Sequence, residues 1–137
     1  EETRDIAARL GRHARPGDVV ALYGDLGSGK TCFIQGLAAG LDVEGPVTSP
    51  TFILIAEHTG GRLPLYHVDL YRTGGLEEIR ALGLEEILGG RGVTAIEWAE
   101  KAEALLPAGT VRVRLEGAGE ESRTIEVDGL PEGWPPA

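Results

Sequence analysis

Helical and extended patterns of apolar residues alternate along this chain, which is typical of an α/β fold. Apolar residues at helical spacing predict helices at residues 1–14, 30–41, 76–88 (two short stretches) and 99–106. Continuous or alternating apolar runs predict strands at residues 18–23, 52–56, 63–71, 93–96, 111–115 and 125–127. Glycine and proline residues, such as those at Pro16-Gly17 and Pro107, mark where these segments end.

The predicted strands are of two kinds. Residues 18–23 and 93–96 are almost wholly apolar, as expected of parallel strands that are buried on both faces. Residues 52–56 and 63–71 flank the turn Thr59-Gly60-Gly61 and are predicted to form a hairpin. The last two predicted strands alternate apolar and polar residues, so we expect them to pair in antiparallel fashion.

A glycine-rich turn joins the first predicted strand to the second predicted helix. Residues 24–31, Gly-Asp-Leu-Gly-Ser-Gly-Lys-Thr, match the phosphate-binding pattern G-x-x-x-x-G-K-[ST] at every position. The glycines allow the backbone to wrap around phosphates, and the helix expected to open at Lys30 adds its positive dipole end. Lys30 can reach the β- and γ-phosphates, and the Thr31 hydroxyl can ligate Mg²⁺. A glycine turn without a ligand is the alternative, which the flanking strand and helix disfavour.

Strand, glycine-rich turn and helix in that order predict a P-loop NTPase-like fold, with a mixed sheet flanked by helices and antiparallel strands at the C-terminal end. A nucleoside triphosphate with Mg²⁺ is the expected ligand. The residues expected to bind the nucleotide in this segment are Asp25, Leu26, Gly27, Ser28, Gly29, Lys30, Thr31 and Cys32. The Cys32 side chain suits helix packing better than nucleophilic chemistry.

A P-loop enzyme also needs a carboxylate at the end of a neighbouring strand to hold the metal ion or its water shell. Glu97 follows the apolar strand 93–96, and Asp69 follows a more mixed strand that looks like a hairpin arm. We therefore interpret Glu97 as the carboxylate on the metal side, and Asp69 as the group that orients or deprotonates the attacking water. The alternative for each is a strand-end carboxylate that pairs with Arg72 or Arg80.

Three further features admit both a functional and a structural interpretation. The segment Thr48-Ser49-Pro50-Thr51 lies where switch loops of P-loop proteins sense the γ-phosphate, but hydroxyl-rich proline turns are also common linkers. His67 is interpreted as a half-buried strand residue rather than a catalyst. Trp98 can belong to the core, yet its place directly after Glu97 at a strand end favours a role in the site.

Composition narrows the class of protein. We treat residues 1–137 as a single P-loop ATPase domain, because 137 residues are too few for two ordinary domains. An apolar fraction of 42% and a charged fraction of 26% are globular, and no apolar run reaches the length of about 18 residues needed to span a bilayer. A net charge of −9 argues against binding DNA, or tRNA other than indirectly. The single cysteine, Cys32, fits a cytoplasmic protein.

The absence of a guanine-recognition motif favours adenine as the base of the nucleotide. Guanine-specific P-loop proteins usually read the base with an Asn-Lys-x-Asp type motif. This chain contains no Asn and no Lys-x-Asp, so ATP is favoured by elimination.

Four motifs in this order resemble those of the TsaE (YjeE) family, small bacterial ATPases of tRNA threonylcarbamoyladenosine biosynthesis. The resemblance runs from about residue 2 to residue 127 and is far more specific than the P-loop alone. The motifs are residues 24–31, Thr48-Ser49-Pro50-Thr51-Phe52, His67-Val68-Asp69-Leu70-Tyr71-Arg72 and Ile96-Glu97-Trp98.

The resemblance implies roles for the residues that match. Lys30 and the loop amides would bind the phosphates, Thr31 with Glu97 would ligate Mg²⁺, and Asp69 would be the catalytic carboxylate. Thr51 belongs to the segment that resembles the switch-like loop of the family, and Trp98 matches its functionally important tryptophan. Thr3, in a Glu-Glu-Thr start, would contact the adenine side of the nucleotide. The chain begins at that motif without an initiator Met, so the extreme N-terminus is expected to be processed or missing.

By the same resemblance, the partners are TsaD and TsaB, and ATP hydrolysis drives turnover of the complex that modifies adenosine 37 of tRNAs reading codons that start with A. The chain would then be an ATPase that is weak alone, and Arg72 is a candidate arginine finger. A small-molecule or nucleotide kinase is a second hypothesis, although no Arg-dense insertion could serve as a lid. A nucleotide-binding module without catalysis is the third.

Overall fold

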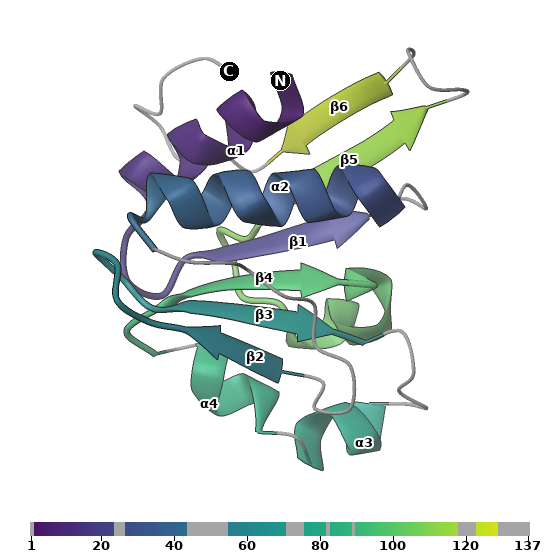
Figure 1. The fold of residues 1–137 in the computed structure, drawn as a ribbon. Helices are drawn as coiled ribbons and strands as arrows, with labels where there is room; N and C mark the ends of the chain where they lie inside the picture. Colours follow the sequence, from purple (N-terminus) through teal and green to yellow (C-terminus); the bar gives the residue numbers. More distant parts are fainter. Residues whose placement is uncertain are drawn as a thin grey trace.

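The computed structural model of the chain describes residues 2–23, 27–43, 55–70, 76–81, 83–88, 90–117 and 123–128 (Figure 1). Helices and strands alternate along most of this length, as the hydrophobic pattern predicts. In chain order they are α1 (Glu2–His13), β1 (Val19–Tyr23), α2 (Gly27–Gly40), β2 (Ile55–His58), β3 (Leu65–Asp69), α3 (Leu76–Ala81), α4 (Leu84–Leu88), β4 (Val93–Glu97), the 3₁₀ helix η1 (Ala99–Leu105), β5 (Val111–Gly117) and β6 (Arg123–Asp128).

The six strands form one mixed sheet in the order β2-β3-β4-β1-β5-β6. The four inner strands β3, β4, β1 and β5 run parallel to one another, and the edge strands β2 and β6 pair with β3 and β5 in antiparallel fashion. The mixed sheet, the hairpin β2–β3 and the antiparallel pair β5–β6 confirm the predicted fold class. Every residue of β1 is buried, as its continuous apolar sequence requires.

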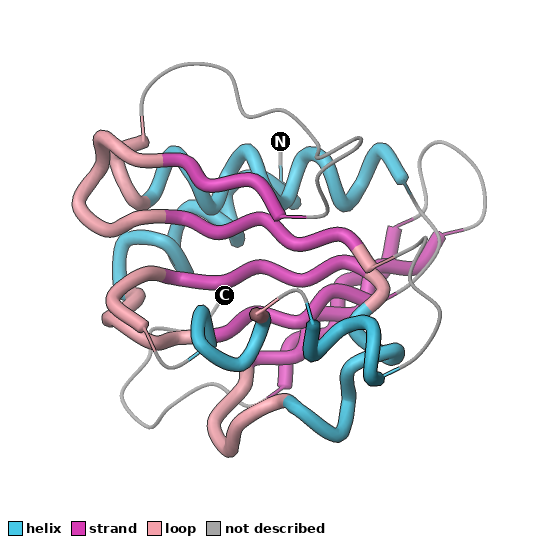
Figure 2. Tube along the Cα trace, turned by 90° about the horizontal axis from the view of Figure 1, so that it is seen from below, coloured by secondary structure: helices cyan, strands magenta, loops and turns pink. Residues whose placement is uncertain are grey.

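Helices cover both faces of the sheet, which lies between the long helices and the short ones (Figure 2). On one face α1 and α2 form a hydrophobic cluster with alternate strand residues such as Leu22, Leu65 and Ala95. On the other face α3, α4 and η1 form a second cluster with Ala21, Ile96 and the remaining alternate positions. Each strand residue therefore faces one helical layer or the other, which decides where the polar residues at the strand ends point.

Three expectations about the elements need correction. The second helix begins at Gly27, three residues before the expected start at Lys30, because the first turn of a helix leaves its N–H groups unpaired and small residues fit there at little cost. Residues 99–105 form a helix, as predicted, but it is of the 3₁₀ type and is kinked at Ala102. The strand before Asp69 is a hairpin arm, but it also pairs in parallel with β4, as the strand before Glu97 does with β1.

The helices α1 and α2 pack with their backbones in close contact. A Cβ atom built on Gly36 would lie 2.4 Å from the carbonyl oxygen of Arg4, and one on Gly40 would lie 2.2 Å from that of Ala8. A Cβ on Gly11 would lie 2.5 Å from the carbonyl oxygen of Leu37. Glycine at these three positions therefore holds α1 directly against the helix that follows the P-loop.

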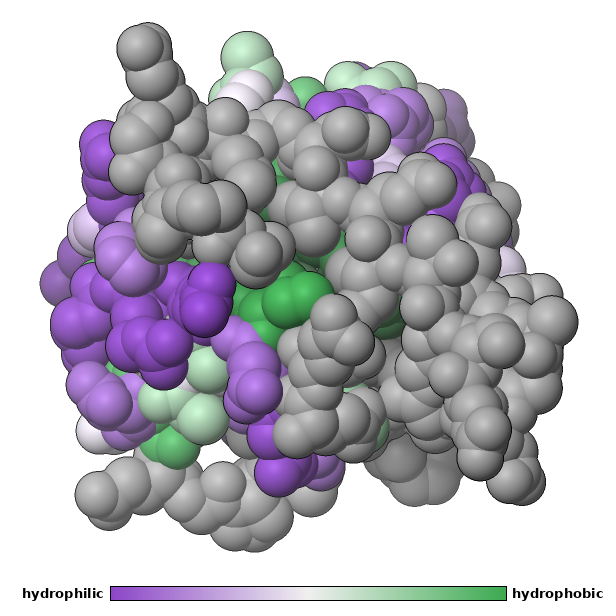
Figure 3. All heavy atoms as spheres, turned by 90° about the horizontal axis from the view of Figure 1, so that it is seen from above, coloured by the Kyte–Doolittle hydropathy of each residue, from purple (hydrophilic) through white to green (hydrophobic). Residues whose placement is uncertain are grey.

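On the face seen in Figure 3, the described residues are hydrophilic toward the left of the view, and a hydrophobic patch lies near its centre. Within the ranges that the structure describes, no helix combines the length and apolar character needed to cross a membrane.

Candidate functional site

The carboxyl ends of three neighbouring strands meet at one edge of the sheet (Figure 1). The strand β1 ends at Tyr23, the residue before the P-loop, while β4 ends at Glu97 and β3 ends at Asp69. The register pairs Leu22 with Glu97 and Glu97 with Asp69. Open α/β sheets bind ligands outside the carboxyl ends of their parallel strands. The topology therefore brings both predicted carboxylates to the edge where the P-loop begins.

Both carboxylates also lie on the face of the sheet that α2 covers. Glu97 is two residues from Ala95, and Asp69 is four residues from Leu65, and both of these apolar residues pack in the cluster with α2. Because strand side chains alternate between faces, Glu97 and Asp69 share that face with Leu22. The first turn of α2 contains the P-loop residues from Gly27 onward. The carboxylates and the predicted phosphate-binding helix thus belong to the same side of the sheet.

Glu97 forms a hydrogen-bonded pair with His67. His67 Nε2 lies 2.6 Å from Glu97 Oε2, and the side chains are 2% and 14% exposed. His67 is a strand residue, as predicted, but it is fully rather than half buried. The reason is that β3 is an inner strand, on which His67 pairs in register with Ala95 of β4. His67 shares a strand face with Leu65 and Asp69, which could have indicated its burial. That inference also needs the pairing of β3 with β4, which the sequence does not provide.

Arg80 does not neutralise either carboxylate. Its Nε lies 3.4 Å from Glu85 Oε1, in an ion pair whose side chains are both 58% exposed. One alternative interpretation of Asp69 and Glu97, pairing with Arg80, is therefore excluded. The other candidate partner, Arg72, lies outside the described residues.

The chemistry of this edge fits Mg²⁺. Magnesium sites at phosphates usually take one or two carboxylates, and phosphate oxygens and water complete the coordination. Asp69 and Glu97 provide two such oxygen ligands side by side. Among the described residues, no group of three or more His, Cys, Asp or Glu side chains could hold a metal ion without other ligands. The donor set therefore suits an ion that arrives with a nucleotide better than one held in a protein cage.

Trp98 adopts a left-handed backbone conformation directly after Glu97, with φ 60° and ψ 40°. A bulky residue adopts this conformation at a cost of about 1–2 kcal/mol, and strained residues of this kind cluster at functional sites. Its side chain packs against the cluster on the η1 side. The left-handed residue turns the chain from β4 into η1. Within this turn, Lys101 N donates to the Trp98 carbonyl oxygen over 3.1 Å.

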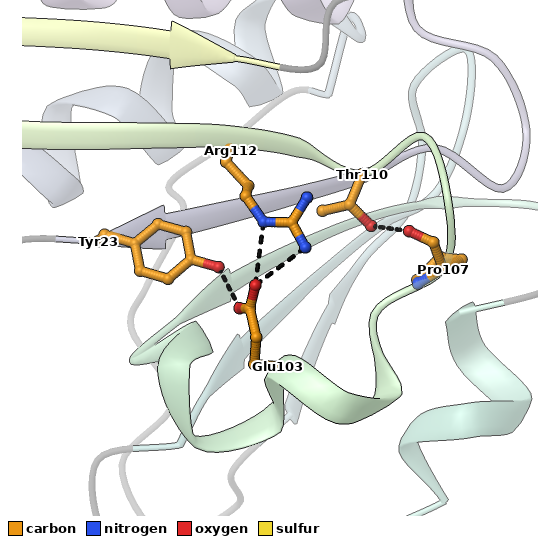
Figure 4. A network of polar contacts seen from close by, with 5 residues as sticks. All are labelled: Tyr23, Glu103, Pro107, Thr110 and Arg112. Carbon is orange, nitrogen blue, oxygen red and sulfur yellow. Dashed lines mark hydrogen bonds and ion pairs between the residues drawn. The ribbon is translucent and has the colours of Figure 1, made fainter.

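A polar network that the sequence analysis missed links the end of β1 to η1 and β5 (Figure 4). Tyr23 Oη donates to Glu103 Oε2 over 2.5 Å, and Arg112 Nε and Nη2 donate to Glu103 Oε1 over 3.1 and 3.0 Å. Burial, with the hydrogen bond to Glu103, raises the pKa of Tyr23 to about 12. The hydrogen bond from Tyr23 chiefly lowers the pKa of Glu103. Arg114 lies over the Tyr23 ring, 5.4 Å from its centroid. This network fixes the last residue before the P-loop.

The remaining predicted site residues fall into three groups. Gly27, Ser28, Gly29, Lys30 and Thr31 form the first turn of α2. Cys32 follows in α2 and is partly exposed. Thr3 lies in α1, next to Arg4, whose Nη2 donates to Gln35 Oε1 in α2 over 2.5 Å. Asp25, Leu26 and Thr51 lie outside the described residues, as does the rest of the segment 48–51.

Comparison with known proteins gives one consistent result. Residues 1–125 match the family model described as threonylcarbamoyl adenosine biosynthesis protein TsaE. The chain is 46% identical over 125 residues to the tRNA threonylcarbamoyladenosine biosynthesis protein TsaE of Bacillus subtilis, covering 91% of this chain and 78% of that protein. It is 45% identical over 127 residues to the protein of the same name from Treponema pallidum, with 93% of each covered. The crystal structure of Bacillus subtilis YdiB superposes with a TM-score of 0.72 at 41% identity, over 90% of this chain and 76% of that chain.

Proposed function

This chain belongs to the TsaE family of threonylcarbamoyl adenosine biosynthesis proteins, and from that premise we propose that it binds ATP with Mg²⁺ and hydrolyses it. One observation carries the proposal. The strand before the P-loop ends beside Glu97, and Glu97 is paired in register with Asp69. A phosphate-binding loop and two carboxylates at one sheet edge are the parts that P-loop hydrolysis requires.

Each residue has a stated role in the proposal. The P-loop amides and Lys30 bind the β- and γ-phosphates, because successive N–H groups and the helix dipole favour an anion there. Thr31 and Glu97 hold Mg²⁺. When bound there, the ion would supply positive charge that offsets the charge developing on the phosphate oxygens. Asp69 orients the attacking water and accepts its proton. Thr3, Thr51 and Trp98 are proposed contacts to the nucleotide.

The proposed reaction supports other proteins of the same pathway. By resemblance to the TsaE family, the partners are TsaD and TsaB, which make threonylcarbamoyladenosine at position 37 of tRNAs that read codons starting with A. The net charge of −9 agrees with a protein that meets tRNA only through its partners. We place the protein in the cytoplasm, where these partners and tRNA are found.

The experiment that tests this function is a steady-state ATPase assay with and without TsaB and TsaD. We expect slow turnover by the chain alone and a rate at least tenfold higher with both partners, because P-loop transition states often need a group supplied by a partner. Lys30→Ala should abolish nucleotide binding and turnover together. Fast, equal turnover by the isolated chain would contradict the partner-dependent mechanism.

A second arm of the assay separates hydrolysis from binding alone. Asp69→Ala should keep nucleotide binding and lose the stimulated turnover. If Asp69→Ala supports threonylcarbamoyladenosine formation as well as the unaltered protein while Lys30→Ala does not, the chain is a nucleotide-binding module and the proposed chemistry is wrong.

A further inference from the structure

The His67–Glu97 pair stands out among the polar contacts because its histidine is buried and only one of its ring nitrogens has a partner. His67 Nε2 lies 2.6 Å from Glu97 Oε2, and the ring is 2% exposed. Among the described residues, His67 Nδ1 is one of three buried side-chain atoms with no hydrogen-bond partner. A buried polar atom without a partner lowers the stability of the fold by about 1–3 kcal/mol. We therefore expect another interaction of the ring to offset this cost.

The contacts of the two nitrogens define which one carries the proton. An ionised carboxylate only accepts hydrogen bonds, so Nε2 must be the donor to Glu97. A proton on Nδ1 would leave a buried donor unpaired, whereas a lone pair there is the less costly arrangement. The contacts therefore favour the tautomer with its hydrogen on Nε2. A histidine in this state acts as a fixed, directional donor to one carboxylate oxygen.

The position of the His67–Glu97 pair explains why a hydrogen-bond donor to the Glu97 carboxylate is useful. His67 lies on β3 two residues before Asp69, and it reaches across to the last residue of β4. Glu97 and Asp69 sit side by side, and adjacent like charges in a sheet repel by about 0.2–1 kcal/mol. A glutamate at a strand end also has three side-chain torsions to restrain. The hydrogen bond to Oε2 restrains them and leaves Oε1 available.

We propose that His67 is a positioning residue, which holds the Glu97 carboxylate so that Oε1 meets the Mg²⁺ ion of the bound nucleotide. The proposal rests on the proposed Mg²⁺–ATP function of this edge. Partners that orient a metal-binding side chain typically change metal affinity by about 10–100-fold when they are removed. His67 itself touches neither the ion nor the nucleotide.

The tautomer of His67 can be measured directly, because the chain has only three histidines. A long-range ¹H–¹⁵N NMR spectrum of the uniformly labelled protein at pH 7.5 reports the protonated nitrogen of each ring, and His67→Gln assigns the signal. We expect the Nε2–H tautomer for His67. A signal from the Nδ1–H tautomer would overturn the proposal, because Nε2 could not then donate to Glu97.

Two substitutions separate the donor from the bulk of the ring. His67→Gln places an amide N–H near the position of Nε2, whereas His67→Leu fills the space without any donor. The readout is the Mg²⁺ concentration that gives half-maximal binding of a fluorescent ATP analogue. We expect about a tenfold increase for His67→Leu and less than about threefold for His67→Gln. Binding of the analogue without Mg²⁺ should be unchanged in both, since the phosphate-binding loop is untouched.

Thr94→Val provides the matched control. Thr94 lies on β4, and its Oγ1, like His67 Nδ1, is buried without a hydrogen-bond partner. It shares the strand face of Ile96, which packs against the other helical layer. The substitution should leave the Mg²⁺ dependence unchanged. Circular dichroism melting curves confirm that each variant folds, and if His67→Leu does not fold, the NMR result and His67→Gln still decide.

The outcomes distinguish this proposal from the proposed function. If the unaltered protein binds the analogue with no dependence on Mg²⁺, the function fails and the role of His67 fails with it. If the unaltered protein depends on Mg²⁺ and His67→Leu behaves in the same way, the function stands and the positioning role is overturned.

Discussion

At the scale of single residues, the candidate site depends on a division of work between two adjacent carboxylates. Glu97 Oε2 lies 2.6 Å from Nε2 of the buried His67 ring, whereas Asp69 ends the neighbouring strand β3, outside that pair. Two carboxylates in different surroundings are suited to different roles, one as a metal ligand and one as a base. This difference supports the proposed roles of Glu97 in Mg²⁺ binding and of Asp69 in proton transfer.

The division predicts different effects for two conservative substitutions. Asp69→Asn should reduce partner-stimulated ATP turnover by about 10²–10⁴-fold, because general base catalysis contributes about that much, and leave nucleotide affinity nearly unchanged. Glu97→Gln should raise the Mg²⁺ concentration needed for nucleotide binding. Glu86→Gln, an exposed carboxylate on α4, is the control for loss of one negative charge. Equal losses of nucleotide affinity in both site variants would contradict the assignment.

Residue identity alone predicted part of this candidate site. Lys30, Thr31 and the glycines around them are predicted from their spacing in the sequence, and their roles stay predictions. The contacts of His67 and Tyr23 could not be predicted from the sequence. Their hydrogen-bond partners lie 30 and 80 residues away in the chain. Sequence periodicity carries no information about such pairs.

At the scale of elements, the hairpin β2–β3 secures the two helices that support the P-loop. Arg62, in the turn of the hairpin, donates from Nη1 to the Ala14 carbonyl oxygen over 3.1 Å and from Nη2 to that of Gly11 over 2.6 Å. The Arg62 backbone N–H donates to the carbonyl oxygen of Leu41, at the end of α2, over 2.6 Å. One residue thus satisfies backbone carbonyls at the ends of both helices.

Replacing Arg62 should therefore destabilise the fold without touching the site. We expect Arg62→Ala to lower the free energy of unfolding in urea by about 1–2 kcal/mol, since charged donors to backbone carbonyls are lost. Arg62→Lys keeps the charge but cannot reach two carbonyls in the same fork geometry, so it should recover only part of the loss. Arg62→Ala with the stability of the unaltered protein would show that the contacts contribute nothing.

The link between β1 and η1 predicts a pH-dependent contribution to stability. The pKa of Tyr23 is raised to about 12, so its contribution is present below the unfolded value of about 10 and is lost as the pH rises through about 12. Tyr23→Phe should cost about 1 kcal/mol at pH 7.5, and the difference should shrink above about pH 10. Urea unfolding at pH 7.5 and 11 measures it. A difference that does not change with pH would contradict the role of the hydroxyl.

Glu103, the other half of this link, behaves in the opposite sense. Its pKa is lowered, chiefly by the Tyr23 hydroxyl, so its contribution is present above its ordinary pKa and is lost as the pH falls. Glu103→Gln should therefore lessen the loss of stability in acid relative to the unaltered protein, measured by urea unfolding between pH 6 and 3. If the loss of unfolding free energy between pH 6 and 3 is the same in both proteins, another carboxylate controls the stability in acid.

The elements themselves were largely predictable. The strand before the P-loop, the hairpin and the antiparallel pair β5–β6 follow from apolar runs and turn residues, because local sequence determines them. The 3₁₀ form of η1 was not predictable, because it depends on the left-handed turn at Trp98 and on packing under the sheet. Tertiary contacts override local preference there.

At the scale of the whole molecule, function depends on strand order, which no local pattern encodes. Placing β4 between β3 and β1 brings together Asp69, Glu97 and the end of β1 at Tyr23, which are separated by up to about 70 residues of chain. Both carboxylates were selected from the sequence as strand-end residues, but their adjacency came only with the register of the sheet. The family membership agrees with this arrangement and names the pathway.

The proposed binding of Mg²⁺ with the nucleotide at this edge of the sheet can be tested by a crystal structure with Mg²⁺ and a non-hydrolysable ATP analogue. We expect phosphates in the P-loop, Mg²⁺ coordinated by Thr31, and Glu97 bound to the ion at about 2.1 Å or through one of its waters. Asp69 should lie within hydrogen-bond reach of the water beside the γ-phosphate. A nucleotide bound with both Glu97 and Asp69 beyond the water shell of the ion would contradict the account.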